Sequence, residues 1–293
     1  MISVILPCYN EEYSIDEGIK NIKTELDKFG AEYEVIVVDD GSNDESVKKL
    51  KSLDVKLVTH PHNIGYGAAL KSGIKKANFD TIIISDIDGS YPANHIPELL
   101  NIYFDSNKNS LGFDMLVGAR KGKEYHGSFF KFLFRKLLKF LVEWTTGRKI
   151  IDINSGLRIF SKKTISSFLP QLCNTFSFTT SLTLAYLLTN KFVKYHPIEY
   201  EKRIGKSHVK IFRDSLRTLQ YITEAIIFYN PLKLFLLFFI FFIMLSAILF
   251  VFYIFKGLNS YLVMSGFTLL ISFISLFFGL HLDLIRQNFL NKK

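Results

Sequence analysis

The first 230 residues alternate between short apolar runs and longer segments in which apolar residues recur at helical spacing. The apolar runs lie at 2–6, 33–38, 55–59 and 81–85, with a weaker one at 115–118, and the helical segments at about 11–29, 44–52, 66–77 and 93–104. This alternation predicts an α/β fold with a largely parallel, doubly wound sheet. Residues 35–38 and 82–84 are apolar throughout, as expected of parallel strands buried on both faces.

The C-terminal part of the chain has a different pattern, because residues 234–255 and 261–280 contain no charged side chain. At about 1.5 Å per residue, each run forms a helix of roughly 30 Å, which is long enough to cross a hydrocarbon core. With the short link at 256–260, the two runs predict a transmembrane hairpin over 231–284. A buried helical hairpin of a soluble protein is the alternative, but soluble helices rarely stay uncharged on all faces over this length.

Basic residues flank the hairpin at one end. They are Arg213, Arg217, Lys233, Arg286, Lys292 and Lys293, whereas the link between the runs contains only Lys256. The positive-inside rule therefore predicts that both termini, residues 1–230 and a basic tail at 285–293 are cytoplasmic. The N-terminus lacks a basic region followed by a long apolar stretch, so we expect no signal peptide there.

Two further segments, 127–146 and 209–230, combine apolar helical stripes with basic residues. In the first, Phe130, Leu133, Phe134, Leu137, Leu141 and Trp144 follow one stripe, and Lys131, Arg135, Lys136 and Lys139 lie mostly outside it. Basic amphipathic helices of this kind lie in membrane interfaces. A core helix with a solvated basic face is the alternative for 127–146.

Composition and charge restrict the partners of the chain. The formal net charge is +9, and the only cysteines are Cys8 and Cys173. Two distant cysteines exclude a disulfide scaffold and a four-cysteine zinc site. The positive charge favours anionic partners. Because the basic residues gather beside amphipathic and membrane segments, lipids and phosphates explain the charge better than nucleic acid does.

Polar and acidic clusters follow three of the predicted strands, at 7–11, 39–42 and 86–89. Ligands of doubly wound sheets bind beyond the carboxyl ends of the strands, where these clusters should meet. Asp86 and Asp88 occupy alternate positions directly after an apolar strand. Two such carboxylates suit a hard divalent cation, Mg²⁺ or Mn²⁺, which also binds substrate phosphates. A solvated acidic turn is the alternative.

Gly65 and Gly67 match the start of a dinucleotide-binding fingerprint, but Leu70 replaces its third glycine and the match follows the third strand. The close approach of helix and strand that the fingerprint needs is therefore not met. A nicotinamide or flavin site is disfavoured. The two glycines instead predict a helix N-terminus that approaches a nucleotide, or a simple turn.

Together these stretches resemble glycosyltransferase family 2, which has the GT-A fold. The matching stretches are PCYNE (7–11), VDDGS (38–42), NIGYG (63–67) and DIDGSYP (86–92). Two later ones, NSGLRIF (154–160) and RIGKS (203–207), resemble the polyprenyl-phosphate branch, which includes dolichol-phosphate mannose synthase and undecaprenyl-phosphate glucosyltransferases. The resemblance implies transfer of a sugar from a nucleotide diphosphate sugar to a polyprenyl phosphate, and in-line attack by the lipid phosphate predicts inversion at the anomeric carbon. The two-span tail favours a UDP-hexose over GDP-mannose.

The resemblance also implies roles for individual residues. Those implied to bind the nucleotide sugar are Pro7, Tyr9, Glu11, Asp39, Asp40, Gly67, Asp86, Ile87, Asp88 and Arg120. Asp86 and Asp88 would hold Mg²⁺ or Mn²⁺. Asp88, Arg203 and Lys206 would form the catalytic group, in which the basic side chains neutralise phosphates of donor or acceptor.

The implied domain organisation has four parts. Residues 1–208 form a cytoplasmic GT-A catalytic domain, and 209–230 form a juxtamembrane amphipathic helix. The hairpin and the basic tail follow at 231–284 and 285–293. Whether the chain forms a homo-oligomer is left open.

Two positions depart from the family pattern. Ser90 stands where dolichol-phosphate mannose synthases often have a glutamine that helps the metal, and Gly156 stands where some bacterial glucosyltransferases have a carboxylate. No base is therefore carried over, and Asp152 is the nearest carboxylate. The acceptor does not need a strong base, because a phosphate monoester with a second pKa of about 6 is already largely dianionic at neutral pH.

Two other functions stay open beside lipid-linked glycosyl transfer. A processive polysaccharide synthase of the same superfamily usually carries a Gln-x-x-Arg-Trp motif, and the only tryptophan here, Trp144, lies outside such a motif. A membrane scaffold that keeps the fold without activity is the other alternative. The acidic pair and the basic residues at 203 and 206 argue against it.

Overall fold

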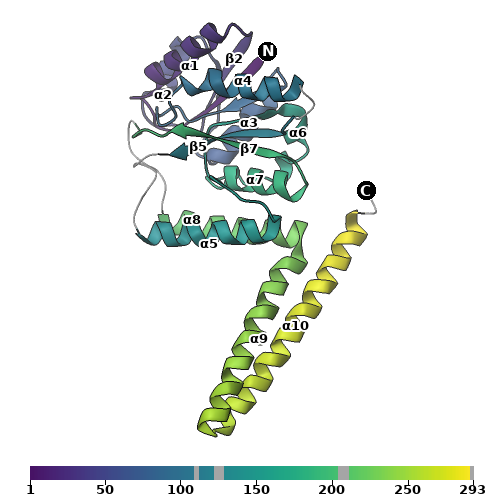
Figure 1. Cartoon of the computed structure of the whole chain (residues 1–293). Helices are drawn as coiled ribbons and strands as arrows, with labels where there is room; N and C mark the ends of the chain where they lie inside the picture. The colour runs from purple at the N-terminus through teal and green to yellow at the C-terminus, as the bar shows by residue number, and fades with distance from the viewer. Residues whose placement is uncertain (109–111, 122–128, 204–210, 291–293) are drawn as a thin grey trace. The chain divides into compact units, whose positions relative to one another are not determined.

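The computed structural model describes residues 1–108, 112–121, 129–203 and 211–290. By internal contacts the chain divides into two compact units (Figure 1). The first comprises Met1–Phe140 and Arg148–Tyr221, and the second comprises Leu141–Gly147 and Ile222–Lys293. The first contains the sheet and the second the long apolar helices.

A seven-stranded sheet organises the first unit, in the order β3-β2-β1-β4-β6-β5-β7. Its strands are β1 (Ile2–Cys8), β2 (Tyr33–Asp39), β3 (Lys56–Thr59), β4 (Thr81–Ile84), β5 (Met115–Lys121), β6 (Arg158–Ser161) and β7 (Val193–Glu199). Only β6, between β4 and β5, is antiparallel to its neighbours among the described strands. The predicted α/β fold with a mostly parallel sheet is confirmed.

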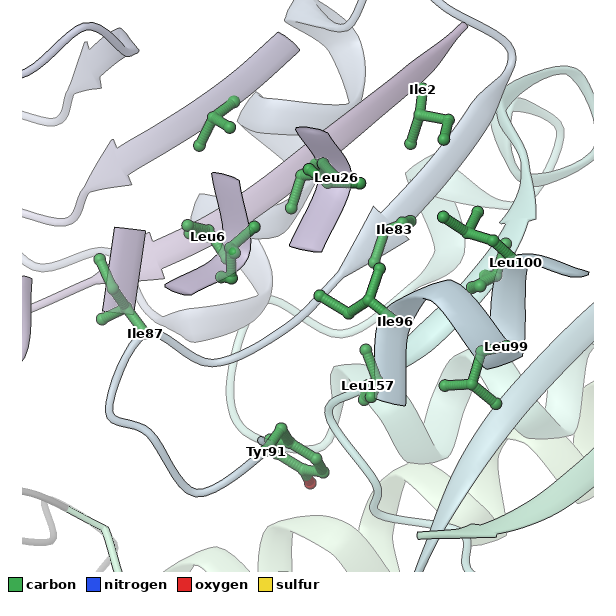
Figure 2. Packing of buried hydrophobic residues seen from close by; sticks show 14 of the residues in the cluster. Ile2, Leu6, Leu26, Ile83, Ile87, Tyr91, Ile96, Leu99, Leu100 and Leu157 are labelled. Carbon is green, nitrogen blue, oxygen red and sulfur yellow. The ribbon is translucent and has the colours of Figure 1, made fainter. Parts of the chain in front are cut away.

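The helices of this unit are α1 (Ile15–Phe29), α2 (Ser46–Ser52), α3 (Tyr66–Lys76), α4 (His95–Lys108), α6 (Lys162–Ser166) and α7 (Phe178–Leu188), with a 3₁₀ helix at Leu169–Gln171. Two further helices, α5 (Phe129–Thr146) and α8 (Ile211–Tyr229), begin in the first unit and end in the second. Figure 2 shows the core beside β1, where Leu6 and Ile83 of the sheet lie with Leu26 of α1 and Ile96 of α4. Burial of these apolar side chains stabilises the layers by roughly 25 cal/mol per Å².

Strand register brings the polar clusters to one edge of the sheet. Cys8 at the end of β1 pairs with Asp39 at the end of β2, and Ile5 pairs with Ile84 at the end of β4. The backbone then continues from Ile84 into Asp86 and Asp88. The three clusters predicted at 7–11, 39–42 and 86–89 therefore start from neighbouring parallel strands.

The second unit consists mainly of α9 (Pro231–Lys256) and α10 (Asn259–Leu290). Both helices are long and apolar enough to cross a membrane, and most of their apolar side chains are exposed. Ser246 and Ser265 join the helices, because the hydroxyl of each donates to the main-chain carbonyl of the other at 2.9 and 3.0 Å and the two hydroxyls lie 3.1 Å apart. Outward-facing apolar surface with small polar contacts inside is typical of helix pairs in membranes.

The N-terminus of α9 contacts the C-terminus of α5. The indole Nε1 of Trp144 donates to the carbonyl of Lys233 at 3.1 Å, and the Lys233 ammonium donates to the carbonyl of Thr145 at 2.9 Å. A lysine at this position satisfies a carbonyl that the helix leaves unpaired and complements the negative end of the helix dipole. Most side chains of the stripe predicted in 127–146, and those of Arg213 and Arg217, lie outside the described residues.

Candidate functional site

Asp86 and Asp88 lie in the loop that follows β4, and helix α1 packs against that loop. Gly18 of α1 packs against the main chain of Ile87, so that a Cβ at Gly18 would lie 2.5 Å from the Ile87 carbonyl oxygen. Ile87 itself is buried in the core. The residue between the two aspartates therefore anchors the loop, while the carboxylates on either side face the carboxyl edge of the sheet.

The Asp86 carboxylate is partly buried between two elements that are far apart in sequence. The hydroxyl of Tyr66, at the start of α3, donates to Asp86 Oδ1 at 2.9 Å. The other oxygen, Oδ2, borders Gly156, where a Cβ would lie only 2.9 Å away. Burial, followed by the charge of Asp88, raises the pKa of Asp86. The Tyr66 hydroxyl and the charges of Arg120 and Arg203 offset this rise only in part, which leaves room for a cation to stabilise the charged form.

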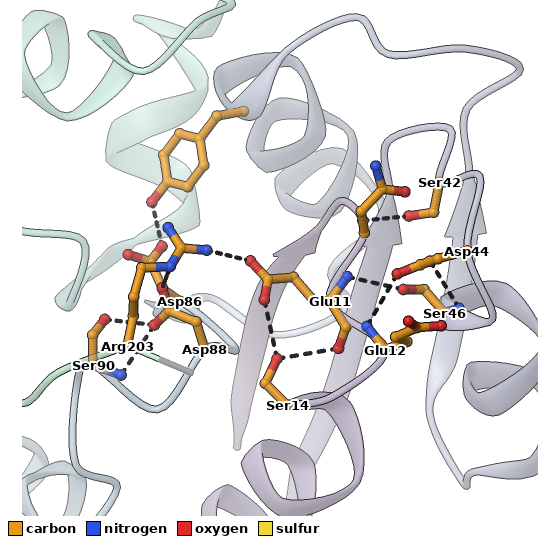
Figure 3. A network of polar contacts seen from close by, with 12 residues as sticks. Glu11, Glu12, Ser14, Ser42, Asp44, Ser46, Asp86, Asp88, Ser90 and Arg203 are labelled. Carbon is orange, nitrogen blue, oxygen red and sulfur yellow. Dashed lines mark hydrogen bonds and ion pairs between the residues drawn. The ribbon is translucent and has the colours of Figure 1, made fainter. Parts of the chain in front are cut away.

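The Asp88 carboxylate is held from one side by Ser90. The main-chain N–H and the hydroxyl of Ser90 donate to Asp88 Oδ1 at 3.0 and 2.5 Å (Figure 3). Asp88 Oδ2 lies 3.5 Å from Nε of Arg203. Ser90 therefore orients the Asp88 carboxylate.

Arg203 links Asp88 to Glu11, at the end of the first predicted cluster (Figure 3). Its Nη2 lies 2.6 Å from Glu11 Oε1. Burial raises the pKa of Glu11 to about 7, although the charge of Arg203 opposes that rise. Arg203 is thus the cation that partly offsets this acidic group. Lys206, predicted to act with it, lies outside the described residues.

Asp39 and Asp40 are adjacent but differ in their partners. Asp39 Oδ2 accepts hydrogen bonds from the N–H groups of Gly41 and Ser42 at 3.2 and 3.3 Å. Its Oδ1 is buried and has no hydrogen-bond partner among the described residues. A buried acceptor without a partner is costly unless a ligand supplies the donor. The geometry is therefore compatible with the predicted role of Asp39 in binding the nucleotide sugar.

Both oxygens of Asp40 are already used by the loop before α3. Oδ1 lies 2.7 Å from His60 Nδ1 and accepts from the N–H of Ile64 at 3.0 Å. Oδ2 accepts from the N–H of Gly65 at 2.7 Å. Asp40 thus fixes the backbone that leads into α3, and a direct contact of this residue with the nucleotide stays a prediction.

Arg120 and Asp152 form a two-pronged ion pair, with Nε to Oδ2 at 2.7 Å and Nη2 to Oδ1 at 2.8 Å. The Asp152 carboxylate also accepts from the main-chain N–H of Arg120 and of Asn154, both at 3.1 Å. Burial alone would raise the pKa of Asp152, but these partners lower it. A carboxylate so tied is a poor proton acceptor, which argues against Asp152 as a catalytic base.

The remaining predicted residues lie around the same edge. Pro7 is the penultimate residue of β1, and Tyr9 follows that strand. Gly67 lies in the first turn of α3, where a Cβ would overlap the carbonyl oxygen of Cys173. Gly67 therefore permits close packing of α3 on the segment before α7, and its contact with a nucleotide stays a prediction.

Sequence reasoning missed Tyr66 and Gly18 as parts of the site. Tyr66 lies inside the NIGYG stretch, whose glycines alone received attention, and nothing local in the sequence marks its hydroxyl as a partner of Asp86. Gly18 lies inside an otherwise regular amphipathic helix. A glycine there costs helix stability relative to alanine, and this cost was the available signal.

A cavity of about 340 Å³ opens beside Asp86 and Ile87, between α1 and the start of α4. Pro92, Glu201 and Lys202 are among its lining residues. Asp86, but not Asp88, is among the lining residues, and the volume falls within the range of ligand pockets.

The acidic pair fits a divalent cation that keeps other ligands. Among the described residues, no group of three or more His, Cys, Asp or Glu side chains is arranged to hold a metal. Asp86 and Asp88 supply two carboxylates, each with one oxygen directed away from its hydroxyl partner. Mg²⁺ typically binds through one or two carboxylates plus waters and substrate phosphates. A metal that arrives with a diphosphate suits this donor set.

Residues 3–165 match the model of the family described as "Glycosyl transferase family 2". An undecaprenyl-phosphate 4-deoxy-4-formamido-L-arabinose transferase of Salmonella typhimurium is 30% identical over 191 residues, which cover 60% of this chain and 56% of that protein. The protein of the same name from Klebsiella pneumoniae is 27% identical over 248 residues, or 80% of this chain and 69% of that protein. The chain thus spans little more than half the length of the Salmonella protein and about two thirds of the Klebsiella protein.

Solved structures share the fold of the first unit. Glucosyl-3-phosphoglycerate synthase from Mycobacterium tuberculosis, in complex with Mn²⁺, UDP and glucosyl-3-phosphoglycerate, has a TM-score of 0.60. The two sequences are 18% identical, and the match covers 77% of this chain and 79% of that one. Its complex with phosphoglyceric acid has a TM-score of 0.62 at 18% identity. The match establishes the GT-A-like arrangement of sheet and helices.

Proposed function

Because the chain belongs to glycosyl transferase family 2, we propose that it transfers a sugar from a nucleotide diphosphate sugar to a polyprenyl phosphate. The observation that carries the proposal is the group formed by Asp86, Asp88, Glu11 and Arg203 at the carboxyl edge of a GT-A-like sheet. Carboxylates for a metal and an arginine for phosphates are what transfer from a diphosphate needs.

Two observations support a polyprenyl phosphate as acceptor. The curated relatives are named as undecaprenyl-phosphate transferases, and this chain carries two helices that are long and apolar enough to cross a membrane. A membrane-bound enzyme meets a lipid phosphate at the bilayer surface. The basic residues that flank the helices favour the cytoplasmic face for the first unit, where nucleotide sugars would be supplied.

A UDP-hexose with Mg²⁺ or Mn²⁺ is the favoured donor pair. One complex of glucosyl-3-phosphoglycerate synthase, which has the same fold, holds Mn²⁺ together with UDP, which supports a divalent cation in this arrangement of strands. Asp39 would accept from the base or ribose through the buried oxygen that lacks a partner. A bound cation would neutralise the leaving diphosphate, and Asp86 and Asp88 would hold it.

The chain's own residues favour in-line displacement without a protein base. An oxygen of the acceptor phosphate attacks the anomeric carbon, and the bond from that carbon to the donor diphosphate breaks, which inverts the configuration. Asp152 is tied to Arg120 and cannot readily take a proton. No protein base is needed, because the attacking phosphate is already largely dianionic at neutral pH. Arg203 brings the two anions together by offsetting their charge.

The proposal is tested with membranes that contain the full chain. They are incubated with polyprenyl phosphate and a panel of labelled UDP- and GDP-sugars, and the extracted lipid is analysed by mass and anomeric configuration. We expect one sugar per lipid phosphate with inverted configuration. Retention would overturn the in-line step, and a polymer would favour a polysaccharide synthase.

The matched pair Asp88→Ala and Asp54→Ala tests the assignment of the acidic pair. Asp88 is buried beside Arg203, whereas Asp54 is fully exposed and pairs with Lys23. We expect Asp88→Ala to lower transfer by on the order of 10³-fold or more with membrane insertion intact, because the cation loses a ligand. Asp54→Ala should retain full activity. Equal turnover in both variants would remove Asp88 from the catalytic group.

A further inference from the structure

The two aspartates of the acidic pair share an arrangement. In each, the Oδ1 atom accepts from a hydroxyl, namely Tyr66 on Asp86 at 2.9 Å and Ser90 on Asp88 at 2.5 Å. In each, the Oδ2 atom faces elsewhere, toward Gly156 in Asp86 and toward Arg203 in Asp88. Each neutral donor therefore fixes one oxygen; the second oxygen of Asp86 accepts no described hydrogen bond, whereas that of Asp88 lies 3.5 Å from Arg203.

The hydroxyl on Asp86 belongs to a side chain that is itself fixed. The ring of Tyr66 stacks on Phe176, with ring centres 5.6 Å apart and planes 20° from parallel. The backbone on either side of Tyr66 is fixed as well, because the Gly65 N–H donates to Asp40 at 2.7 Å and the Ala68 N–H donates to the Asn174 carbonyl at 3.0 Å. Such constraints leave the hydroxyl little freedom to leave Asp86.

We propose that Tyr66 is the positioning residue for the metal ligand Asp86, and that Phe176 holds its ring in place. This inference rests on the proposed function, because it assumes that the acidic pair binds Mg²⁺ or Mn²⁺. Hydrogen bonds to metal-ligating carboxylates orient them, and loss of such a bond typically lowers metal affinity or activity by about 10- to 100-fold. Tyr66 acts through Asp86 and need not touch the substrate.

The variant Tyr66→Phe tests the hydrogen bond without removing the ring. It keeps the stack on Phe176 and deletes only the hydroxyl. Tyr33→Phe is the matched control, because the Tyr33 hydroxyl also donates to an aspartate, Asp27 Oδ1, at 2.7 Å, but on the exposed surface of α1. Phe176→Ala is a second variant, which keeps the hydroxyl and removes its support.

Mn²⁺ affinity is measured directly, by electron paramagnetic resonance of the free ion with the purified full chain. We expect Tyr66→Phe to weaken Mn²⁺ binding about 10-fold, Phe176→Ala to weaken it by a smaller factor, and Tyr33→Phe to leave it unchanged. Raising the Mn²⁺ concentration should restore kcat of Tyr66→Phe toward the wild-type value. A general loss of structure would not be rescued in this way, and melting curves without metal check that the variants are folded.

The results separate this inference from the proposed function. Wild-type chain that binds Mn²⁺, with Tyr66→Phe within about twofold of it, would overturn the role of Tyr66 and leave the proposed function in place. Wild-type chain that binds no Mn²⁺, with or without a nucleotide diphosphate, would overturn the metal site of the proposed function itself. Weaker binding by Tyr66→Phe that Mn²⁺ rescues would support both.

Discussion

Two groups of carboxylates lie at the same edge of the sheet and differ in how completely their charge is compensated. Asp40 and Asp152 have each of their oxygens used by donors from the chain itself. Asp39 is buried, and its Oδ1 has no hydrogen-bond partner among the described residues; Asp86 is partly buried, and only its Oδ1 accepts a described hydrogen bond. Buried polar groups are normally paired, so compensated carboxylates indicate a structural role and uncompensated ones a place where a ligand binds.

The same difference separates the adjacent residues Asp39 and Asp40, one of which is open to a ligand while the other fixes a loop. Asp39 ends β2 and Asp40 follows it, and successive residues of an extended chain point in opposite directions. One side chain therefore faces the loop before α3 and the other faces the open edge. The carboxylate that fixes the loop also fixes the start of α3, which carries Tyr66 and thereby reaches Asp86.

The largest expected contrast comes from Asp40→Ala and Asp39→Ala. Loss of the Asp40 carboxylate leaves the N–H groups of Ile64 and Gly65 and the ring of His60 without their acceptor, which should lower the free energy of unfolding by about 2 to 4 kcal/mol. Asp39→Ala should change stability by less than about 1 kcal/mol and weaken binding of the nucleotide sugar about 10-fold. Denaturant titration and calorimetric binding with the purified full chain measure the two quantities.

The comparison fails if the two variants behave alike. Equal losses of stability would mean that the unpaired oxygen of Asp39 does not distinguish it from Asp40. Equal losses of donor affinity at unchanged stability would mean that Asp40 contacts the nucleotide, as the sequence resemblance implied.

The sequence predicts the sheet edge better than it predicts what surrounds it. Apolar runs located β1, β2 and β4, and the polar residues after them located the acidic pair, because strand ends and turn residues leave local signals. The antiparallel strand β6 and the helix α7 were not predicted. β6 contains the buried Arg158, and α7 is buried on every side, so neither shows the periodicity that marks an amphipathic element.

The other features that the sequence did not predict are contacts between segments that are distant along the chain. The Tyr66 hydroxyl reaches Asp86 across 20 positions, and Arg203 reaches Glu11 across 192. No local pattern encodes such pairs, because they depend on how the whole sheet is assembled. The resemblance supplied Arg203 as a phosphate ligand, and the structure adds its ion pairs with Glu11 and Asp88.

An intermediate effect is expected from Gly18→Ala, which disturbs the loop that carries Asp86 and Asp88. The new Cβ would lie 2.5 Å from the Ile87 carbonyl oxygen, so that α1 or the loop of the acidic pair must shift. We expect transfer to fall about 10-fold, since a small misplacement of catalytic groups is costly. Stability should change little, because alanine also favours the helix by about 1 kcal/mol.

Gly266→Ala is the matched control for that variant, because a Cβ at Gly266 of α10 would meet nothing within 4 Å. It should leave transfer unchanged. Normal activity of Gly18→Ala, measured beside this control with the same labelled donor, would show that the loop tolerates the shift and that its position is less restricted than the packing suggests.

The smallest expected effect is on the pH dependence of stability. A rise in pH should lower the contribution of Glu11 to stability and raise that of Asp152. Burial raises the pKa of Glu11 to about 7, so the protonated form favours the fold. Its contribution to stability is present below the usual pKa of 4.5 and is lost as the pH rises through about 7. The pKa of Asp152 is lowered by Arg120, so its contribution is present above the usual pKa of 3.8 and is lost in acid.

Glu11→Gln and Asp152→Asn should therefore change opposite ends of the profile of melting temperature against pH. Glu11→Gln should reduce the fall in melting temperature between pH 5 and pH 8 by a few degrees, which corresponds to about 1 kcal/mol once solvent screening at this half-buried position is allowed for. Asp152→Asn should lower the melting temperature at neutral pH and reduce the further loss in acid, because the ion pair with Arg120 is already gone. Melting curves in metal-free buffer at several pH values test both. A profile of Glu11→Gln that is parallel to the wild-type profile would show that Arg203 compensates Glu11 fully, and Glu11 would then belong with Asp40 and Asp152.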